Sequence, residues 1–372
     1  MTWHRAAAII DLDAIVANAQ VLDRASGDAE LMAVVKADAY GHGVARVAPA
    51  LRASGVPWLG VALPSEAVEL RSAGDRGRIL AWLWVPGDPL VTACIDLDID
   101  LGVSSREALQ QVSDTARIRG GRARVHLKID TGLSRNGVPE HEWEDLVRAA
   151  LDDPRIDLVG VWSHLARADE PDVGTTDEQA ERFTHALDVA RSLGAKPEHV
   201  HLANSAGILA HPDTHHTLVR TGIGLYGVTP GPGLGDPTAH GLRPAMEIRA
   251  RLALVKRIPA GAGVGYGHTW IAPDDTTVGL VPLGYSDGIP RASNGAWVSV
   301  AGRRAPVIGR VAMDQFVVHL GEAVPVGTEV EVLGPNAMDA EEWGHSAGTI
   351  GYEVVTRIGS RLPRHYRGDT WT

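Results

Sequence analysis

The chain has a single cysteine, Cys94, among its 372 residues. One cysteine excludes an intramolecular disulfide and a zinc site built on cysteines, and it is typical of a reducing compartment. Positive charge is also scarce, since 35 Lys and Arg stand against 46 Asp and Glu and give a formal net charge of -11. Nucleic-acid and anionic-membrane surfaces need clustered Lys and Arg, whereas the basic residues here are scattered, so neither kind of partner is expected.

Long apolar runs are missing as well. Near the start, Asp11 and Asp13 interrupt a short hydrophobic stretch, which is typical neither of a signal peptide nor of a membrane span. We therefore expect a cytoplasmic protein. With 44% hydrophobic residues the chain is long enough for two domains, or for one large α/β domain with an appendage.

Short apolar runs alternate with helix-forming stretches through the first two-thirds of the chain, as repeated βα units require. Eight such units close a (β/α)8 TIM-type barrel, whereas the rival doubly wound sheet more usually has five or six strands. The sequence therefore predicts an α/β barrel. The candidate strands are Leu31–Val35, Trp58–Leu63, Arg78–Trp84, Asp98–Val103, Ala123–Ile129, Asp157–Ser163, His199–Ala203 and Leu218–Thr221, and the helical segments include Ser65–Ala73, Arg106–Arg119, Glu140–Leu151 and Thr176–Leu193.

Glycine and proline are concentrated between Gly227 and Pro244, a stretch that neither a helix nor a central strand could contain. Beyond it, short valine-rich segments predict a mainly β domain. We expect the barrel over residues 10–236 and the β domain over 237–372; Ala6–Ile10 could belong to either. The candidate strands of the second domain are Met246–Lys256, Val278–Pro282, Ala296–Val300, Ala305–Val311, Phe316–Leu320 and Glu329–Leu333, with helices near Asp339–Ser346 and Thr349–Ile358.

Lys36 follows the buried run Leu31–Val35 and precedes a turn that contains Gly41 and Gly43. An amine held partly desolvated at such a strand end has a lowered pKa, which makes it a nucleophile able to form a Schiff base with an aldehyde. The alternative is a lysine whose ammonium group reaches solvent from the end of the strand.

Other polar side chains follow barrel strands at their carboxyl ends, where barrels bind ligands. Each alone has a structural explanation, as a surface arginine, a satisfied core histidine or a helix cap. Their coincidence at one rim favours a binding site. They are Lys128 and Arg135 after the fifth strand, His164 after the sixth, Asn204 and Ser205 after the seventh, and Arg220 to Gly224 at the eighth.

The loops after the seventh and eighth strands hold a phosphate in many barrels. Asn204–Gly207 resembles a helix start with a hydroxyl in its first turn, and Gly222–Gly224 lets the backbone approach an anion. Together with a strand-end lysine and no metal signature, these loops predict pyridoxal phosphate. If Arg220 faces the pyridine nitrogen, that nitrogen stays unprotonated, because a guanidinium does not give up its proton. The weaker electron sink then favours proton exchange over transamination.

Two other motifs lack the context that they need. Gly222–Gly227 matches the dinucleotide pattern GxGxxG, but the Gly/Pro-rich linker follows it where a helix is required. His211, His215 and His216 lie close together beside Pro212, without a carboxylate pattern, so no zinc site is expected.

In the second domain, Tyr266 stands among glycines in Gly263–Gly267, where little can pack on it, although it could be a turn aromatic. Polar or aromatic residues also flank glycine in Gly284–Gly288, Gly309–Gln315 and Gly351–Glu353. Such positions are unusual for a purely structural β module.

From Val34–Gly43 through Arg361–Tyr366, the whole chain resembles the alanine racemases, pyridoxal-phosphate enzymes of fold type III, and Gly132–Gly137 is similar to their actinobacterial branch. The resemblance implies interconversion of L-alanine and D-alanine, with D-alanine supplied for peptidoglycan. It also implies a head-to-tail homodimer with shared active sites, in which residues 1–9 join the β domain.

The resemblance assigns two bases. Lys36 would bind the cofactor and act on the Cα of the D-enantiomer, while Tyr266 of the partner subunit would act on the L-enantiomer from the opposite face, as inversion requires. A tyrosine of ordinary pKa is a poor base at neutral pH, and His164 and Arg220 match the residues that polarise it. Asp314 is a further catalytic candidate.

The remaining matches concern cofactor and substrate. The resemblance places Arg135 near the phenolic oxygen, the backbone N–H of Met313 at the substrate carboxylate, and Tyr285 with Tyr352 at a narrow entrance. Lys128 stands where a carbamylated lysine that steadies Arg135 is often found. The phosphate-binding set is Tyr40, Asn204, Ser205, Gly222, Ile223 and Tyr352.

Two positions depart from the family pattern: Ala312 stands where cysteine is common, and Ser286 where alanine or glycine is common. Neither removes a catalytic group. The alternatives are a broader racemase for serine or basic amino acids, in a biosynthetic or resistance role, and a non-catalytic pyridoxal-phosphate-binding homologue. A decarboxylase would favour an acidic residue over Arg220 at the pyridine nitrogen.

Overall fold

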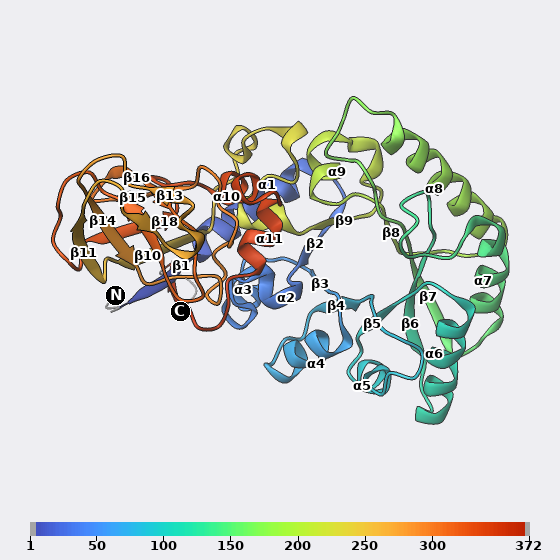
Figure 1. Ribbon diagram of the computed structural model, residues 1–372. Coiled ribbons are helices and arrows are strands. Elements are labelled where there is room, and N and C mark those ends of the chain that lie inside the picture. Colours follow the sequence, from blue (N-terminus) through green and yellow to red (C-terminus); the bar gives the residue numbers. More distant parts are fainter. Residues whose placement is uncertain (1–4, 369–372) are drawn as a thin grey trace.

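Eight parallel strands form the first sheet of the computed structural model, which describes residues 5–368 (Figure 1). No ladder joins the two end strands, but Thr217 N donates to Val200 O at 3.1 Å and Arg220 N to Ala203 O at 3.1 Å, so the barrel is nearly closed. The predicted TIM-type barrel is confirmed, and the open doubly wound sheet is wrong. In sheet order the strands are β8 (His199–His201), β7 (Ile156–Trp162), β6 (Ala123–Lys128), β5 (Asp100–Val103), β4 (Arg78–Ala81), β3 (Trp58–Val61), β2 (Glu30–Val34) and β9 (Leu218–Thr221).

Helices surround this sheet, and the four helices named from the sequence occur within two residues of their expected bounds (Figure 1). Local signals explain their ends. Ser105 caps α6 by accepting a hydrogen bond from Ala108 N at 3.2 Å, and Gly120 ends that helix with a φ of 72°. The helices of the barrel are α1 (Leu12–Ala25), α2 (Lys36–Tyr40), α3 (Val44–Ala53), α4 (Pro64–Ser72), α5 (Leu90–Asp96), α6 (Arg106–Arg119), α7 (Glu140–Asp152), α8 (Thr175–Ser192) and α9 (Ser205–Ala210).

The second domain is built on a nine-stranded sheet in the order β11-β14-β17-β16-β15-β18-β10-β1-β19. It is mainly β, as predicted. Strands β12 and β13, which lie between β11 and β14 in the sequence, form a separate two-stranded sheet. Two helices follow β18. The elements are β10 (Met246–Arg251), β11 (Leu254–Ile258), β12 (Gly263–Val264), β13 (Trp270–Ile271), β14 (Thr276–Val281), β15 (Trp297–Val300), β16 (Arg303–Ile308), β17 (Phe316–His319), β18 (Glu329–Leu333), α10 (Ala340–Ala347), α11 (Gly351–Thr356) and β19 (Arg364–Arg367).

One strand prediction in this domain is wrong. Met246–Lys256 was expected as a single strand but forms β10 and β11, which lie far apart in the sheet. The chain changes partners between them, because Leu252 N donates to Thr328 O at 3.0 Å and Ala253 N donates to Leu280 O at 2.9 Å. Tertiary pairing therefore divides a segment that has no glycine or proline at the break.

The amino-terminal strand β1 (Ala6–Asp11) belongs to the second sheet, where it runs antiparallel to β10 and parallel to β19. This pairing answers the question that the sequence left open for Ala6–Ile10. Residues 1–4, the first part of the segment expected to join the β domain, lie outside the described residues. Within the described range no helix is both long and apolar enough to cross a membrane.

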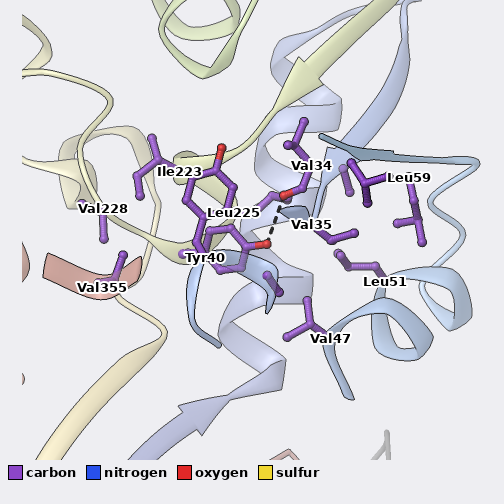
Figure 2. Packing of buried hydrophobic residues seen from close by; sticks show 14 of the residues in the cluster. Val34, Val35, Tyr40, Val47, Leu51, Leu59, Ile223, Leu225, Val228 and Val355 are labelled. Atoms are coloured by element: carbon purple, nitrogen blue, oxygen red, sulfur yellow. Dashed lines mark hydrogen bonds between the residues drawn. The ribbon is translucent and has the colours of Figure 1, made fainter. Parts of the chain in front are cut away.

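The hydrophobic core continues under the end of β2, where the barrel meets α11 (Figure 2). Val34 and Val35 are buried there, and the Val34 carbonyl accepts a hydrogen bond from the Tyr226 hydroxyl at 3.1 Å. The core thus supports the backbone from which Lys36 projects. Its members in this region include Tyr40, Val47, Leu51, Leu59, Ile223, Leu225, Val228 and Val355.

Candidate active site

Lys36 begins α2, which is a left-handed turn. The φ angles are 53° at Ala37, 53° at Asp38, 54° at Ala39 and 52° at Tyr40. Left-handed backbone costs about 1–2 kcal/mol for each residue with a side chain, or about 4–8 kcal/mol for four. Strain of this kind persists only where the surroundings over-determine the conformation, and it gathers at functional sites.

Three side chains hold this turn. Asp38 Oδ1 accepts from Val44 N at 2.7 Å, and Glu66 Oε1 accepts from Ala37 N at 2.6 Å. His42 Nδ1 lies 3.0 Å from the Ala39 carbonyl and 2.9 Å from the Tyr40 carbonyl, so this nitrogen carries the ring hydrogen. The glycines Gly41 and Gly43 predicted a turn after Lys36, but no sequence pattern predicted that the turn is left-handed.

The Lys36 amine lies half-buried at the carboxyl end of the barrel. Its Nζ is 5.8 Å from the centre of the Tyr40 ring and 5.9 Å from that of Trp82. Burial lowers the pKa of Lys36, the positive charge of Arg135 lowers it further, and Glu66 opposes both. These surroundings favour the interpretation of Lys36 as a reactive amine over the alternative, in which its ammonium group simply extends into solvent.

Lys128 lies in the same mouth of the barrel and is only 4% exposed. Its Nζ is 4.3 Å from the centre of the Trp162 ring. Burial, together with the charges of Arg220 and Arg135, lowers the pKa of Lys128 to about 7. The four basic side chains Lys36, Lys128, Arg135 and Arg220 therefore make a cationic mouth that an anionic ligand would complete.

Arg220 is buried and makes only contacts with neutral acceptors in the described part of the chain. Its Nη2 donates to the carbonyls of Ser163 at 2.9 Å and Leu202 at 3.0 Å, and to His164 Nδ1 at 3.2 Å, while Nη1 donates to His201 Nδ1 at 3.0 Å. Burial lowers the pKa of Arg220 to about 9, so it keeps its charge at neutral pH.

His164 is a neutral ring in this arrangement. Burial lowers its pKa well below the ordinary value, and the nearby Arg220 lowers it further. Because His164 Nδ1 accepts from Arg220, its Nε2 carries the hydrogen and can donate to another group. The structure thus places His164 in contact with Arg220, the two residues that the resemblance assigns as polarising groups for Tyr266.

A group of hydroxyls and backbone N–H donors lies beside the cationic mouth. Ser205 Oγ accepts from Gly222 N at 2.9 Å and Gly224 N at 3.3 Å. A Cβ at Gly222 would lie 2.4 Å from the Tyr40 hydroxyl, so only glycine leaves room there. The Tyr352 ring centre is 6.4 Å from that of Tyr40, which adds a third hydroxyl to the group.

These residues fit pyridoxal phosphate. The hydroxyls of Tyr40 and Ser205 suit phosphate oxygens, and none of the residues is a carboxylate that would repel an anion. The Gly222 N–H and the Tyr352 hydroxyl are donors of the same kind, which here donate to Ser205 Oγ and to the Pro230 carbonyl. The buried Ile223 continues the same loop. Asn204 has a local role, because its Oδ1 caps α9 by accepting from Gly207 N at 2.9 Å.

The candidate residues of the β domain form a separate group. Tyr266 lies on a short 3-10 turn and is 70% exposed, Met313 is 53% exposed, and Tyr285 is exposed as well. Between residues 5 and 368 no hydrogen bond, ion pair or ring contact joins these three to the barrel. A single chain therefore does not bring Tyr266 to Lys36.

Asp314 and Ser286 brace the Met313 loop. Asp314 Oδ1 accepts from Arg361 Nη1 at 2.8 Å, and Ser286 Oγ donates to the Met313 carbonyl at 2.7 Å. Ser286 N donates to the same carbonyl at 3.0 Å. The hydroxyl at this departure from the family pattern thus contributes a contact that alanine or glycine would lack.

Sequence reasoning missed three contributors to the mouth: Trp82, Trp162 and His201. Trp162 Nε1 is buried and has no hydrogen-bond partner among the residues that the structure describes. All three lie in or next to apolar strand segments, where an aromatic residue is usually interpreted as part of the hydrophobic core. Only the closed barrel shows that they face Lys36, Lys128 and Arg220.

Comparison with known proteins agrees with this architecture. Two family models match, "Alanine racemase, N-terminal domain" over residues 10–230 and "Alanine racemase, C-terminal domain" over residues 245–366. The alanine racemase of Streptomyces coelicolor is 49% identical, over 97% of this chain and 96% of that protein. That of Mycobacterium tuberculosis is 45% identical, over 97% and 96%.

Solved structures give the same result. The alanine racemase of D-cycloserine-producing Streptomyces lavendulae has a TM-score of 0.97 and 49% identity, covering 99% of this chain and 98% of that one. An alanine racemase from Bartonella henselae with covalently bound pyridoxal phosphate has a TM-score of 0.88 and 28% identity, covering 98% and 99%. The resemblance seen in the sequence, including its actinobacterial character, is confirmed, and the chain belongs to the alanine racemase family.

Proposed function

We propose that this protein is a pyridoxal-phosphate-dependent racemase that interconverts L-alanine and D-alanine and supplies D-alanine for peptidoglycan. The observation that carries the proposal is Lys36, an amine of lowered pKa at a barrel strand end, beside a cationic mouth and a group of phosphate-compatible donors. Membership of the family supports the same activity and the same cofactor.

The cofactor, when bound, supplies an electron sink that acidifies the Cα proton of an amino acid. Lys36 Nζ would hold it covalently and Arg135 would meet its phenolic oxygen. Arg220 would face its pyridine nitrogen and, by keeping its own proton, would leave that nitrogen unprotonated. The phosphate would be bound by Tyr40, Ser205, Tyr352 and the loop of Asn204, Gly222 and Ile223.

Two bases then act on opposite faces of the substrate. Lys36 removes or returns the proton on the face used by the D-enantiomer, and Tyr266 does so on the face used by the L-enantiomer. His164 Nε2–H is available to polarise the Tyr266 hydroxyl, since His164 Nδ1 is already occupied by Arg220.

The position of Tyr266 supports a head-to-tail homodimer. Tyr266 is exposed and lies in a domain where nothing joins it to Lys36 of the same described chain, so Tyr266 of the partner subunit would complete each site. Tyr285 and Met313 of the partner subunit would line the substrate side, with the Met313 N–H at the carboxylate. Asp314, held by Arg361, stays a catalytic candidate beside them.

Further parts of the proposal concern modification, location and domains. Lys128, with a pKa of about 7, is partly neutral at physiological pH, and a neutral amine is the form that carbon dioxide converts to a carbamate. A carbamate there would offset the charges of Arg135 and Arg220.

We also propose a cytoplasmic location and a division into a barrel over residues 10–236 and a β domain over 237–372, joined by residues 1–9.

The test is α-deuteration. The purified protein with pyridoxal phosphate is incubated in D2O with L-alanine, L-serine or L-lysine, and deuterium and enantiomer ratio are followed by chiral chromatography. Fast deuteration of alanine to a racemic mixture supports the proposal. Preference for serine or lysine would indicate the broader racemase, with Ala312 and Ser286 as the first positions to examine. No exchange would indicate the non-catalytic homologue.

A further inference from the structure

A chain of buried polar side chains runs inside the barrel to Arg220. Asp100 is the first residue of β5, and its Oδ2 lies 3.1 Å from His126 Nε2. His126 Nδ1 lies 2.9 Å from His201 Nε2, and His201 Nδ1 lies 3.0 Å from Arg220 Nη1. Asp100, His126 and His201 are completely buried. The chain therefore connects the amino end of the barrel with the mouth.

The two ends of this chain determine where its hydrogens lie. Arg220 has only donors, so His201 Nδ1 accepts and His201 Nε2 carries the hydrogen. His201 Nε2 then donates to His126 Nδ1, and His126 Nε2 carries a hydrogen and donates to the Asp100 carboxylate. A doubly protonated His126 would leave His201 with no hydrogen on either nitrogen, so both rings are neutral. Every donor points from Arg220 toward Asp100.

The barrel is built around these side chains. A Cβ at Gly160 would lie 2.1 Å from His126 Nδ1, so the absence of a side chain at Gly160 makes room for the histidine. Trp162 stacks on His201 with ring centres 5.4 Å apart and an interplanar angle of 9°. Arg124 Nε donates to Asp100 Oδ1 at 3.0 Å. Barrel interiors are usually filled by branched apolar residues, so this polar axis is a departure.

Arg220 is a buried cation, yet the groups that it contacts in the described chain are all neutral: two carbonyls, the rings of His164 and His201, and the Trp162 ring, whose centre lies 5.0 Å from Cζ. A carboxylate in direct contact would bind the guanidinium and compete with any group that faces it. We propose that Asp100 and His126 are positioning residues for Arg220. Asp100, which is itself paired with Arg124 and Arg78, orients the His126 ring, and His126 in turn holds an unprotonated nitrogen of His201 against the guanidinium.

This inference rests on the proposed function for what Arg220 acts on. With a neutral acceptor held against Nη1, and no carboxylate among the described residues in contact with it, the guanidinium keeps its orientation while remaining free to meet the pyridine nitrogen. Neutral rings polarised in one direction also make His201 Nδ1 a better acceptor for Arg220, since hydrogen bonds in a low-dielectric interior strengthen one another.

Neutron diffraction from D2O-exchanged crystals of the holoenzyme tests the chain without reference to activity. We expect deuterium on Nε2 of His126 and of His201, and none on either Nδ1. Deuterium on Nδ1 of either ring would overturn the inference, because the donors would no longer run from Arg220 to Asp100.

Paired carboxylate variants test the positioning role. Asp100→Asn removes the terminal charge; Asp98→Asn is its control, because Asp98 also accepts from Arg78, at 2.9 Å, but is 64% exposed and does not touch His126. Loss of a residue that orients a metal-binding histidine typically costs about 10–100-fold in activity, and by analogy we expect kcat of Asp100→Asn to fall at least about tenfold with little change in KM. Asp98→Asn should match the wild type, and equal kcat for both variants would overturn the inference.

Variants of His126 separate positioning from stability. His126→Gln keeps a donor toward Asp100 and an acceptor toward His201, whereas His126→Leu leaves the buried His201 Nε2–H without an acceptor and Asp100 without one of its donors. We expect the leucine variant to lose both Tm and kcat, and the glutamine variant to keep most of each. If His126→Leu kept the kcat of the wild type, His126 would have only a structural role and no positioning role.

Failure of the proposed function would be distinguishable from failure of this inference. If the wild type does not racemise alanine, the crystal structure of Asp100→Asn decides instead. Loss of the contact between Arg220 Nη1 and His201 Nδ1 would support the positioning role, and an unchanged contact would overturn it.

Discussion

Replacing Lys128 by methionine removes a buried ammonium group while keeping an unbranched side chain of similar length against the Trp162 ring. Burial and the charges of Arg220 and Arg135 lower the pKa of Lys128 from 10.5 to about 7. At a pH between these two pKa values, Lys128 is a neutral amine in the folded protein and an ammonium group in the unfolded chain. The unfolded state thus binds one more proton, and wild-type stability rises with pH.

The size of the effect follows from this difference of one proton. The free energy of unfolding of the wild type should rise relative to Lys128→Met by about 1.4 kcal/mol per pH unit, or about 2.7 kcal/mol from about pH 7.5 to about 9.5. Below the pKa that Lys128 has in the folded protein, the amine is protonated in both the folded and the unfolded state. The difference in the free energy of unfolding between wild type and variant is then constant, and the buried ammonium destabilises the wild type by its full amount.

The assay compares the Tm of apoprotein and variant at equal concentration across this pH range in CO2-free buffer. For a unit of barrel size the expected gain of the wild type is about 5–10 °C. The titration of Lys36 is common to both proteins and cancels in the comparison. Parallel Tm curves would refute the lowered pKa of Lys128. Added bicarbonate should stabilise the wild type alone if Lys128 becomes a carbamate.

Three substitutions test the proposed site directly. Lys36→Ala should lose the visible absorbance of bound cofactor and racemisation together; an active, coloured variant would remove Lys36 from the mechanism. Tyr266→Phe should still bind cofactor, because Tyr266 lies outside the barrel, but lose racemisation by about 10²–10⁴-fold, as is typical for a general base; near-normal rates in both directions would contradict its role. Gly222→Ala should weaken cofactor binding in titrations of the apoprotein, since its Cβ would lie 2.4 Å from the Tyr40 hydroxyl. The loss should be smaller in a Tyr40→Phe background, and equal losses in both backgrounds would show that this contact is not the cause.

Much of the barrel could be predicted from the sequence because most strands contain a short apolar run, and polar residues begin at or near the end of each strand. Lys36, His164 and Arg220 were found by that rule, and the structure places them around one mouth. The rule works because burial on both faces of a parallel strand demands apolar residues along it, while its carboxyl end opens to the ligand.

What the pattern could not predict depends on partners distant in sequence. The segment that forms β10 and β11 has one apolar periodicity, and only Thr328 and Leu280 show where it divides. The left-handed turn after Lys36 is held by Glu66 and His42, which no local propensity anticipates. For non-glycine residues the sequence even argues against that turn, because the strain is offset by contacts that form only in the folded protein.

The two groups of candidate residues differ in burial in a way that separates their tasks. Most of the barrel group is buried, although Lys36 is half-buried and Arg135 is exposed, and its charges affect one another, so a cofactor would find its orientation and electrostatics set within one chain. Tyr266, Tyr285 and Met313 are exposed, as are Leu83 and Val85 on the loop that follows β4 at the mouth of the barrel. In the proposed homodimer, these exposed side chains are the ones that a second copy would cover. Inversion needs a base on the face opposite Lys36, and that approach would deliver Tyr266 there while excluding water from the mouth, so assembly and stereochemistry would depend on the same contact.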